Sequence, residues 1–137
     1  MKSQIGVFLV SIVLFAYCQN ISAQTQGQMN SDASNGYLAA KAQLEGTVNR
    51  ILAMYSGDKE FILAFQISNG AWNNYRDAQL KMKFPAKDPR SAYGSMYGMC
   101  YSSYLEELTR NRIKELRVWA YGVQEGEGCS GSVHFKQ

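Results

Sequence analysis

The sequence predicts an all-α fold: a small antiparallel bundle of three main helices with an irregular, glycine-rich C-terminal tail. Apolar residues recur every three or four positions in three long segments, and only short connections separate these segments. No segment shows the alternating pattern of a β-strand. Helices joined by short connections pack as antiparallel neighbours, so we expect seams rich in aromatic side chains to bury most of the apolar area.

Residues 1–23 are expected to be a secretory signal peptide. Lys2 precedes an apolar run from Ile5 to Tyr17, and the segment ends in the small residues Ser22 and Ala23. A run of about 13 apolar or small residues is too short to span a bilayer of about 30 Å. We place cleavage after residue 23 and expect no stable membrane span afterwards. Cys18 leaves lipidation as an alternative, although a lipidated cysteine normally follows a small residue rather than a tyrosine.

Cleavage there would leave 114 residues, enough for one domain, which we place at 24–121 with the tail at 122–137. The remainder would hold 13 Lys and Arg against 11 Asp and Glu, a net charge of +2. This charge is too small to argue for a nucleic-acid partner. Export predicts a periplasmic or secreted protein, in which disulfides can form.

The first helix is expected at about 32–55, after a polar leader at 24–31 that need not fold. Five apolar positions share one helical face: Tyr37, Leu44, Val48, Ile51 and Tyr55.

The second helix is expected to begin near Lys59, because Gly57 can stop the first helix and Asp58 can cap the next. It should end before Pro85. Its expected core face consists of Phe61, Phe65, Trp72, Tyr75 and Met82.

The connection 84–95 holds both prolines, and Ser91 or Ser95 is expected to cap the third helix, at about 95–121. Glu106 lies four residues before Arg110 on its solvent side. The apolar face of this helix is expected to consist of Met96 or Tyr97, Cys100 or Tyr101, Tyr104, Leu108, Leu116 and Trp119.

An ordered set of residues in all three helices carries a resemblance to a known family. The first helix has Met29, Asn30, Tyr37, Ala40 and Leu44 at the family's spacing. The second has Trp72, Tyr75, Arg76 and Asp77, and the third has Gly94, Ser95, Leu108, Thr109 and Arg112. Over roughly 29–119 the chain resembles the LprI-like lysozyme inhibitor family, as a divergent member. The three family cysteine positions hold Asp32, Leu80 and Tyr104 instead.

The cysteines of the expected mature chain are Cys100 and Cys129. A helix from Cys100 to Tyr121 rises about 31 Å, and the eight residues onward to Cys129 reach about 27 Å when extended. A disulfide allows about 6 Å between the Cα atoms. An intramolecular bridge is therefore barely within reach, and an intermolecular bridge or free thiols are the alternatives.

Nothing in the sequence indicates an enzyme, a metal site or a cofactor. The single histidine, His134, has no nucleophile beside it, and no glycine-rich loop follows a strand. Glu106 and Glu107 are adjacent, so they point in different directions around a helix rather than forming an acid–base pair. The remaining carboxylates are scattered among lysines and arginines.

The matched residues allow a structural and a partner-binding interpretation. We expect Trp72 and Tyr75 to pack in the core. Arg76, beside Asp77, is expected to bind a carboxylate or a helix carbonyl end and to fix the register of the bundle, and Arg112 near Thr109 to act similarly. Direct contact with a partner is the alternative, because an exposed arginine beside aromatic residues is a frequent interface hot spot. Burial of the guanidinium decides between the two.

The resemblance implies an exported inhibitor that occludes the substrate cleft of a lysozyme or another peptidoglycan hydrolase. The charge counts against this function, since lysozymes are commonly basic and this chain is mildly positive. By analogy with unrelated inhibitors that insert a Ser-Gly loop, the tail residues Ser130, Gly131 and Ser132 are a speculative contact, with Cys129 as a brace if bridged. The alternative function is an envelope interaction, immunity or structural module without lysozyme inhibition.

Overall fold

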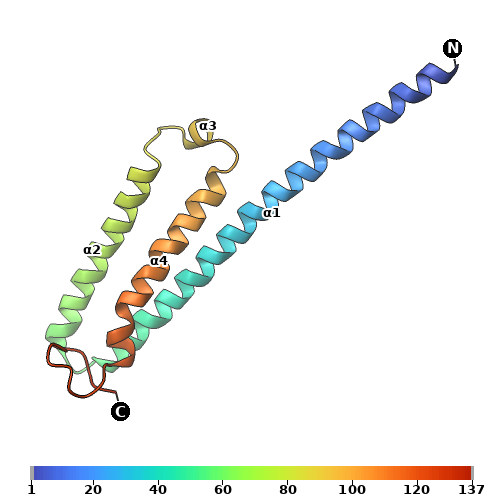
Figure 1. Cartoon of the computed structure of the whole chain (residues 1–137). Coiled ribbons are helices and arrows are strands. Elements are labelled where there is room, and N and C mark those ends of the chain that lie inside the picture. The colour runs from blue at the N-terminus through green and yellow to red at the C-terminus, as the bar shows by residue number, and fades with distance from the viewer. Residues whose placement is uncertain (1, 137) are drawn as a thin grey trace.

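The computed structural model describes the backbone of residues 2–136 and the side chains of residues 25–136. Its helices are α1 (Lys2–Met54), α2 (Lys59–Lys83), α3 (Pro89–Tyr93) and α4 (Tyr97–Tyr121) (Figure 1). Residues 2–136 form no strand, and Val123 and Phe135 make an isolated parallel bridge. The all-α prediction is therefore confirmed. The expected signal peptide lies outside the described side chains, and the domain boundaries stay predictions.

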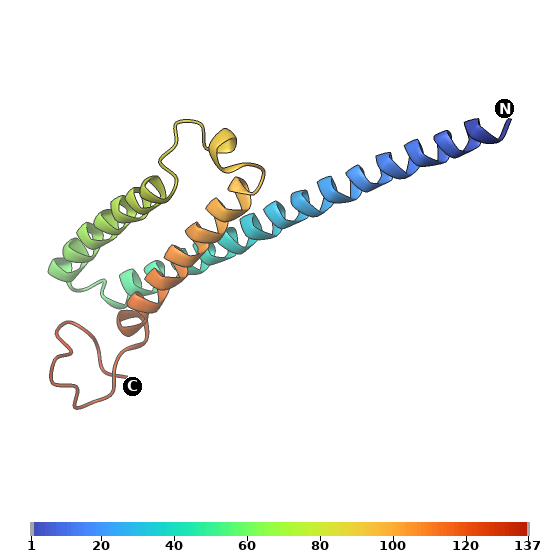
Figure 2. The same ribbon diagram turned by 45° about the horizontal axis from the view of Figure 1, so that its top comes forward.

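The long helices run antiparallel to their neighbours in the chain, so that α1 and α4 are parallel (Figures 1 and 2). Helix α4 packs mainly on α1 and makes fewer contacts with α2. One cluster of the buried core joins the α1 end of the chain to α2 and α4 and consists of Ile51, Tyr55, Phe65, Leu116 and Ala120. Among the described residues, none of the helices contains a stretch apolar and long enough to cross a membrane.

Helix α1 starts earlier than expected, because residues 24–31 are helical. Side chains one turn apart support this segment: Gln26 Nε2 donates to Asn30 Oδ1 at 3.3 Å, and Gln28 Nε2 donates to Asp32 Oδ1 at 2.8 Å. Such i,i+4 pairs stabilise a helix, and the segment contains no proline. The expectation of an unfolded leader is therefore wrong.

Helix α2 begins as predicted, because Asp58 Oδ1 accepts a hydrogen bond from the Phe61 amide at 2.9 Å. Its expected core face is only partly right. Phe65 is buried, but Tyr75 and Met82 are 53% and 68% exposed. At 100° per residue, Tyr75 and Met82 lie about 80° and 100° around the helix from Phe65.

The connection contains a helix that the sequence analysis did not predict. Asp88 caps α3 by accepting hydrogen bonds from the Ser91 hydroxyl at 2.6 Å and the Ser91 amide at 3.3 Å. These two bonds, the hydroxyl bond foremost, lower the pKa of Asp88. Helix α4 follows Met96 without a side-chain cap, so the expectation of a Ser91 or Ser95 cap is wrong. Four rings pack together at this end of the bundle: Phe84, Tyr93, Tyr97 and Tyr101.

The tail is irregular, as predicted, but its base is fixed. The Val123 amide donates to the His134 carbonyl at 3.0 Å, and the Lys136 amide donates to the Val123 carbonyl at 2.8 Å. The His134 ring stacks on Tyr55 with centroids 4.1 Å apart, and Trp119 Nε1 donates to Ser132 Oγ at 3.3 Å. The tail thus closes over the C-terminal end of α4.

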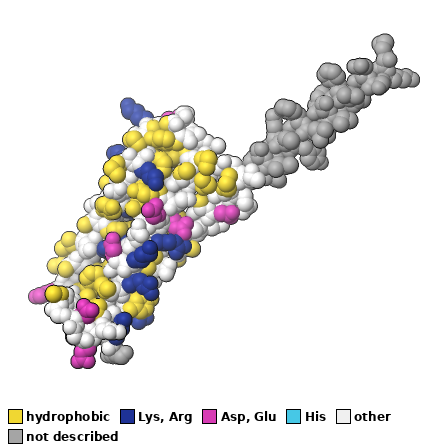
Figure 3. All heavy atoms as spheres, viewed as in Figure 1, with side chains coloured by type: hydrophobic (Ala, Val, Ile, Leu, Met, Phe, Trp, Pro, Cys, Tyr) yellow, Lys and Arg dark blue, Asp and Glu magenta, His cyan; other side chains and the backbone are white. Residues whose placement is uncertain are grey.

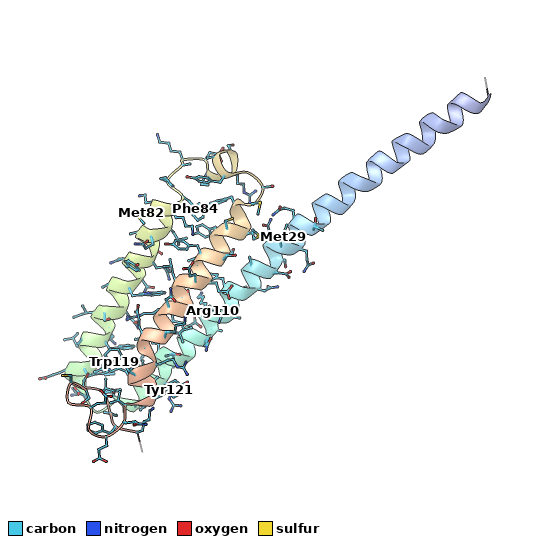
Figure 4. All side chains as sticks on the ribbon, viewed as in Figure 1. Met29, Met82, Phe84, Arg110, Trp119 and Tyr121 are labelled. Carbon is cyan, nitrogen blue, oxygen red and sulfur yellow. The ribbon has the colours of Figure 1, made fainter. Side chains whose placement is uncertain are left out.

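Both described cysteines are free, so the hypothesis of a bridge between Cys100 and Cys129 is wrong. Cys100 lies in the first turn of α4, whereas the tail folds at the other end of that helix. Figure 4 shows this separation, with Phe84 near the start of α4 and Trp119 beside the tail. Hydrogen bonds and ring stacking therefore hold the tail in the place of a disulfide.

Candidate functional site

An open cleft of about 420 Å³ lies between α1 and α2. Its walls combine charged and amide side chains with an indole ring and two aliphatic side chains. The lining residues are Lys41, Leu44, Glu45, Val48, Asn49, Asn69, Trp72, Asn73 and Arg76. Three residues of the family pattern, Leu44, Trp72 and Arg76, are therefore in this cleft.

Arg76 is held by its own helix. Its guanidinium carbon lies 5.4 Å from the centroid of the Trp72 ring, a cation–π arrangement. Its Nε donates to Asp77 Oδ1 at 2.9 Å, and its Nη1 donates to Asn73 Oδ1 at 3.1 Å. The interpretation that Arg76 fixes the register between helices is therefore wrong. The side chain is 25% exposed, so it can still meet a partner.

Arg112 does connect two helices. Its Nη2 donates to Ser68 Oγ at 3.1 Å and to Asn69 Oδ1 at 3.3 Å, both on α2. The side chain is 11% exposed, and its buried Nε has no acceptor within the described part of the chain. These contacts are compatible with the structural interpretation of Arg112, although the partners on α2 are a hydroxyl and an amide oxygen rather than a carboxylate or a helix carbonyl end. Because Asn69 lines the cleft, Arg112 also fixes part of the cleft wall from behind.

Thr109 is buried, and its hydroxyl donates to the Leu105 carbonyl at 2.7 Å. It therefore has a packing role beside Arg112.

The other singled-out residues lie away from the cleft. Tyr75 is on the outer side of α2, and Gly94 ends α3 with a φ of 71°, in the left-handed region that favours glycine. Ser95 follows in the link to α4, and Ser130, Gly131 and Ser132 are in the tail.

A second, basic groove of about 470 Å³, which was not predicted from the sequence, lies between α1 and α4. Its cations are Arg50, Arg110, Lys114 and Arg117, and Figure 3 shows Lys and Arg side chains along α4. Arg50 Nε donates to the Ala120 carbonyl at 2.6 Å and its guanidinium lies over the Tyr121 ring. The i, i+4, i+7 spacing of the three α4 cations places them on one helical face and could have revealed this groove.

Comparison with known proteins adds three findings. The family model described as "Lysozyme inhibitor LprI" matches residues 18–116. The chain is 35% identical over 107 residues to the uncharacterized protein R02472 of Rhizobium meliloti (strain 1021), a match that covers 69% of this chain and 73% of that protein. No solved structure matches. The family match includes the whole α1/α2 cleft and ends before the tail.

Proposed function

The chain belongs to the LprI family of lysozyme inhibitors, and from this premise we propose that it is an exported binding protein that blocks a lysozyme-type peptidoglycan hydrolase. The family consists of inhibitors rather than enzymes. Inhibition requires a surface that fits the hydrolase. We assign the contact to the rim of the α1/α2 cleft.

The observation that carries this assignment is that Trp72 and Arg76, two residues of the family pattern, meet at one open cleft. Arg112, another residue of the pattern, holds the wall of the same cleft through Asn69.

The chemistry of the cleft suits the active site of a glycoside hydrolase. Such an enzyme places two carboxylates beside the scissile bond. The guanidinium of Arg76 can bind a carboxylate through two parallel hydrogen bonds. The Trp72 ring beneath it supplies an apolar anchor that excludes water, as interface hot spots do.

The positive charge of the chain slows the approach to a basic enzyme but does not prevent a local contact. The net charge after the expected cleavage is only +2, and at physiological salt the field falls off over about 8 Å. We therefore expect inhibition of a basic lysozyme to become no weaker as salt rises towards physiological concentration.

Inhibition is tested by adding the purified, exported chain in excess to peptidoglycan with several lysozyme types. We expect lysis by at least one type to slow, and Arg76→Ala to abolish the effect. Arg90→Ala is the matched control, because it removes the same charge from an exposed site on α3, outside both the cleft and the basic groove. Failure of the unaltered chain to slow any enzyme would reject the proposal and favour a non-inhibitory envelope module.

The tail is tested separately by replacing Ser130 and Ser132 with alanine together. The tail lies beyond the family match, so we expect inhibition to survive. Loss of inhibition in this variant, with Arg76→Ala still active, would move the contact from the cleft to the tail.

A further inference from the structure

A second apolar face runs along the outer side of α2. Its residues follow each other at gaps of four, four, four, three and four, which places them on one side of a helix. This α2 outer stripe consists of Leu63, Ile67, Ala71, Tyr75, Ala78 and Met82. All six are exposed, with Leu63 at 61% and Ile67 at 66%.

Within residues 25–136 the stripe is not part of the buried core. The core face of α2 is centred on Phe65 and Leu80, and Ile67 lies about 160° around the helix from Phe65. Figure 3 shows hydrophobic side chains along the edge of the molecule that α2 forms. Contiguous apolar patches on exported or other soluble proteins commonly mark interaction sites. The stripe is therefore a candidate contact surface for another molecule.

We propose that the occupant is the same stripe of a second copy of this chain, bound antiparallel about a two-fold axis near Ala71. Ile67 and Tyr75 are each four residues from Ala71, so in this arrangement Ile67 of one copy meets the partner's Tyr75. The small Ala71 side chains lie on the axis and allow the helices to approach within about 8–10 Å. Such a contact is isologous, and each residue pair forms twice.

The charges at the ends of the stripe select this orientation. Glu60 lies 11 residues before Ala71 and Lys81 lies 10 after it, and both are exposed. Within residues 25–136 neither side chain has an ion-pair partner. Antiparallel pairing brings Glu60 of each copy to the partner's Lys81, whereas parallel pairing would bring like charges together.

The oligomeric state of the purified chain is measured by sedimentation and by light scattering. We expect twice the mass of one chain, and a monomer for Ile67→Glu. Leu38→Glu is the matched control, since Leu38 is exposed on α1 outside the stripe, and it should remain dimeric. Circular dichroism shows whether each variant keeps its helices.

A charge exchange tests the orientation. Glu60→Lys and Lys81→Glu should each weaken the dimer by about tenfold or more, which is about 1.4 kcal/mol, and the double exchange should restore it. A monomeric unaltered chain, a dimeric Ile67→Glu or a failed rescue would overturn the proposal. So would a monomer that sediments with lipid vesicles through the stripe, because lipid would then be the occupant.

Discussion

Replacing Arg112 by alanine should loosen α2 from the rest of the bundle. The backbone of α2 comes close to the other helices at few points. Polar side-chain bridges connect the middle and the C-terminal part of α2 to α4. Arg112 binds Ser68 and Asn69, and Tyr104 Oη donates to Gln79 Oε1 at 3.2 Å. The Arg112 bridge therefore carries a large share of the α2–α4 contact.

The expected cost follows from the surroundings of the guanidinium. Each of the two hydrogen bonds to α2 contributes a net free energy of about 1 kcal/mol, and packing of the buried aliphatic stem of Arg112 adds further stability. The pair with Glu115 is 60% exposed on the carboxylate side and adds little. The substitution also removes the buried Nε that has no acceptor, and this offsets the loss of stability by about 1 kcal/mol or more. We expect a net loss of about 1–2 kcal/mol, or about 4–10 °C in melting temperature for a domain of this size.

Urea unfolding followed by circular dichroism measures this loss. Arg110→Ala is the control, because its i,i+4 pair with Glu106 is partly exposed and should contribute at most about 0.5 kcal/mol. A double-mutant cycle of Arg112→Ala with Asn69→Ala should give a coupling of about 0.5 kcal/mol or more. Equal losses in the two arginine variants, or no coupling, would refute the bridging role.

Three further outcomes are expected. Leu116→Ala removes a side chain that is 2% exposed and should cost about 2–5 kcal/mol in urea unfolding. The pKa of Asp88 is lowered in the fold, so its cap stabilises α3 at any pH above the unfolded pKa of about 3.9, and this stabilisation is lost as the pH falls through the lower pKa of the folded state. NMR of the Ser91 amide should show this loss. The Asp88→Asn variant should show no such pH dependence. Gly122→Ala should release the tail from Tyr55, because a Cβ at a φ of 73° would meet the His134 carbonyl oxygen at 2.6 Å; faster proteolysis of residues 123–136 measures it.

The ends of α2 could be predicted from the sequence, because they depend on residues close to them in the chain. Asp58 and Pro85 gave both ends of α2 because capping and proline geometry act within one turn. The start of α1 was missed because a polar segment was taken as unfolded, although Gln28 and Asp32 stabilise a helix through side-chain pairing. Tyr75 was expected in the core because it follows Trp72 by three residues, and spacings of three and of four residues both fit one helical face. Only tertiary packing decides which of the residues at these spacings is buried.

The candidate site was predictable only in part. Trp72 and Arg76 could be singled out by their spacing with Tyr75 and Asp77. Asn49 and Asn69 could not, since they lie on different helices and share a cleft only through the way α2 is positioned beside α1. The sequence analysis expected Arg112 to link two helices, but it could not identify the partners Ser68 and Asn69. These partners depend on the register of α4 against α2, which no local pattern determines.

The two surfaces assigned to α2 are separable by experiment because they lie on different sides of one helix. Arg76 is about 20° around the helix from Phe65, whereas Ile67 is about 160° away. Arg76→Ala should therefore lose inhibition and remain a dimer, and Ile67→Glu should become a monomer and still inhibit. If Ile67→Glu lost both properties while keeping its helices, the cleft would need the dimer to hold α2 in place. If Arg76→Ala lost both, the cleft and the stripe would not be independent, and the assignment of the dimer contact to the outer stripe alone would fail.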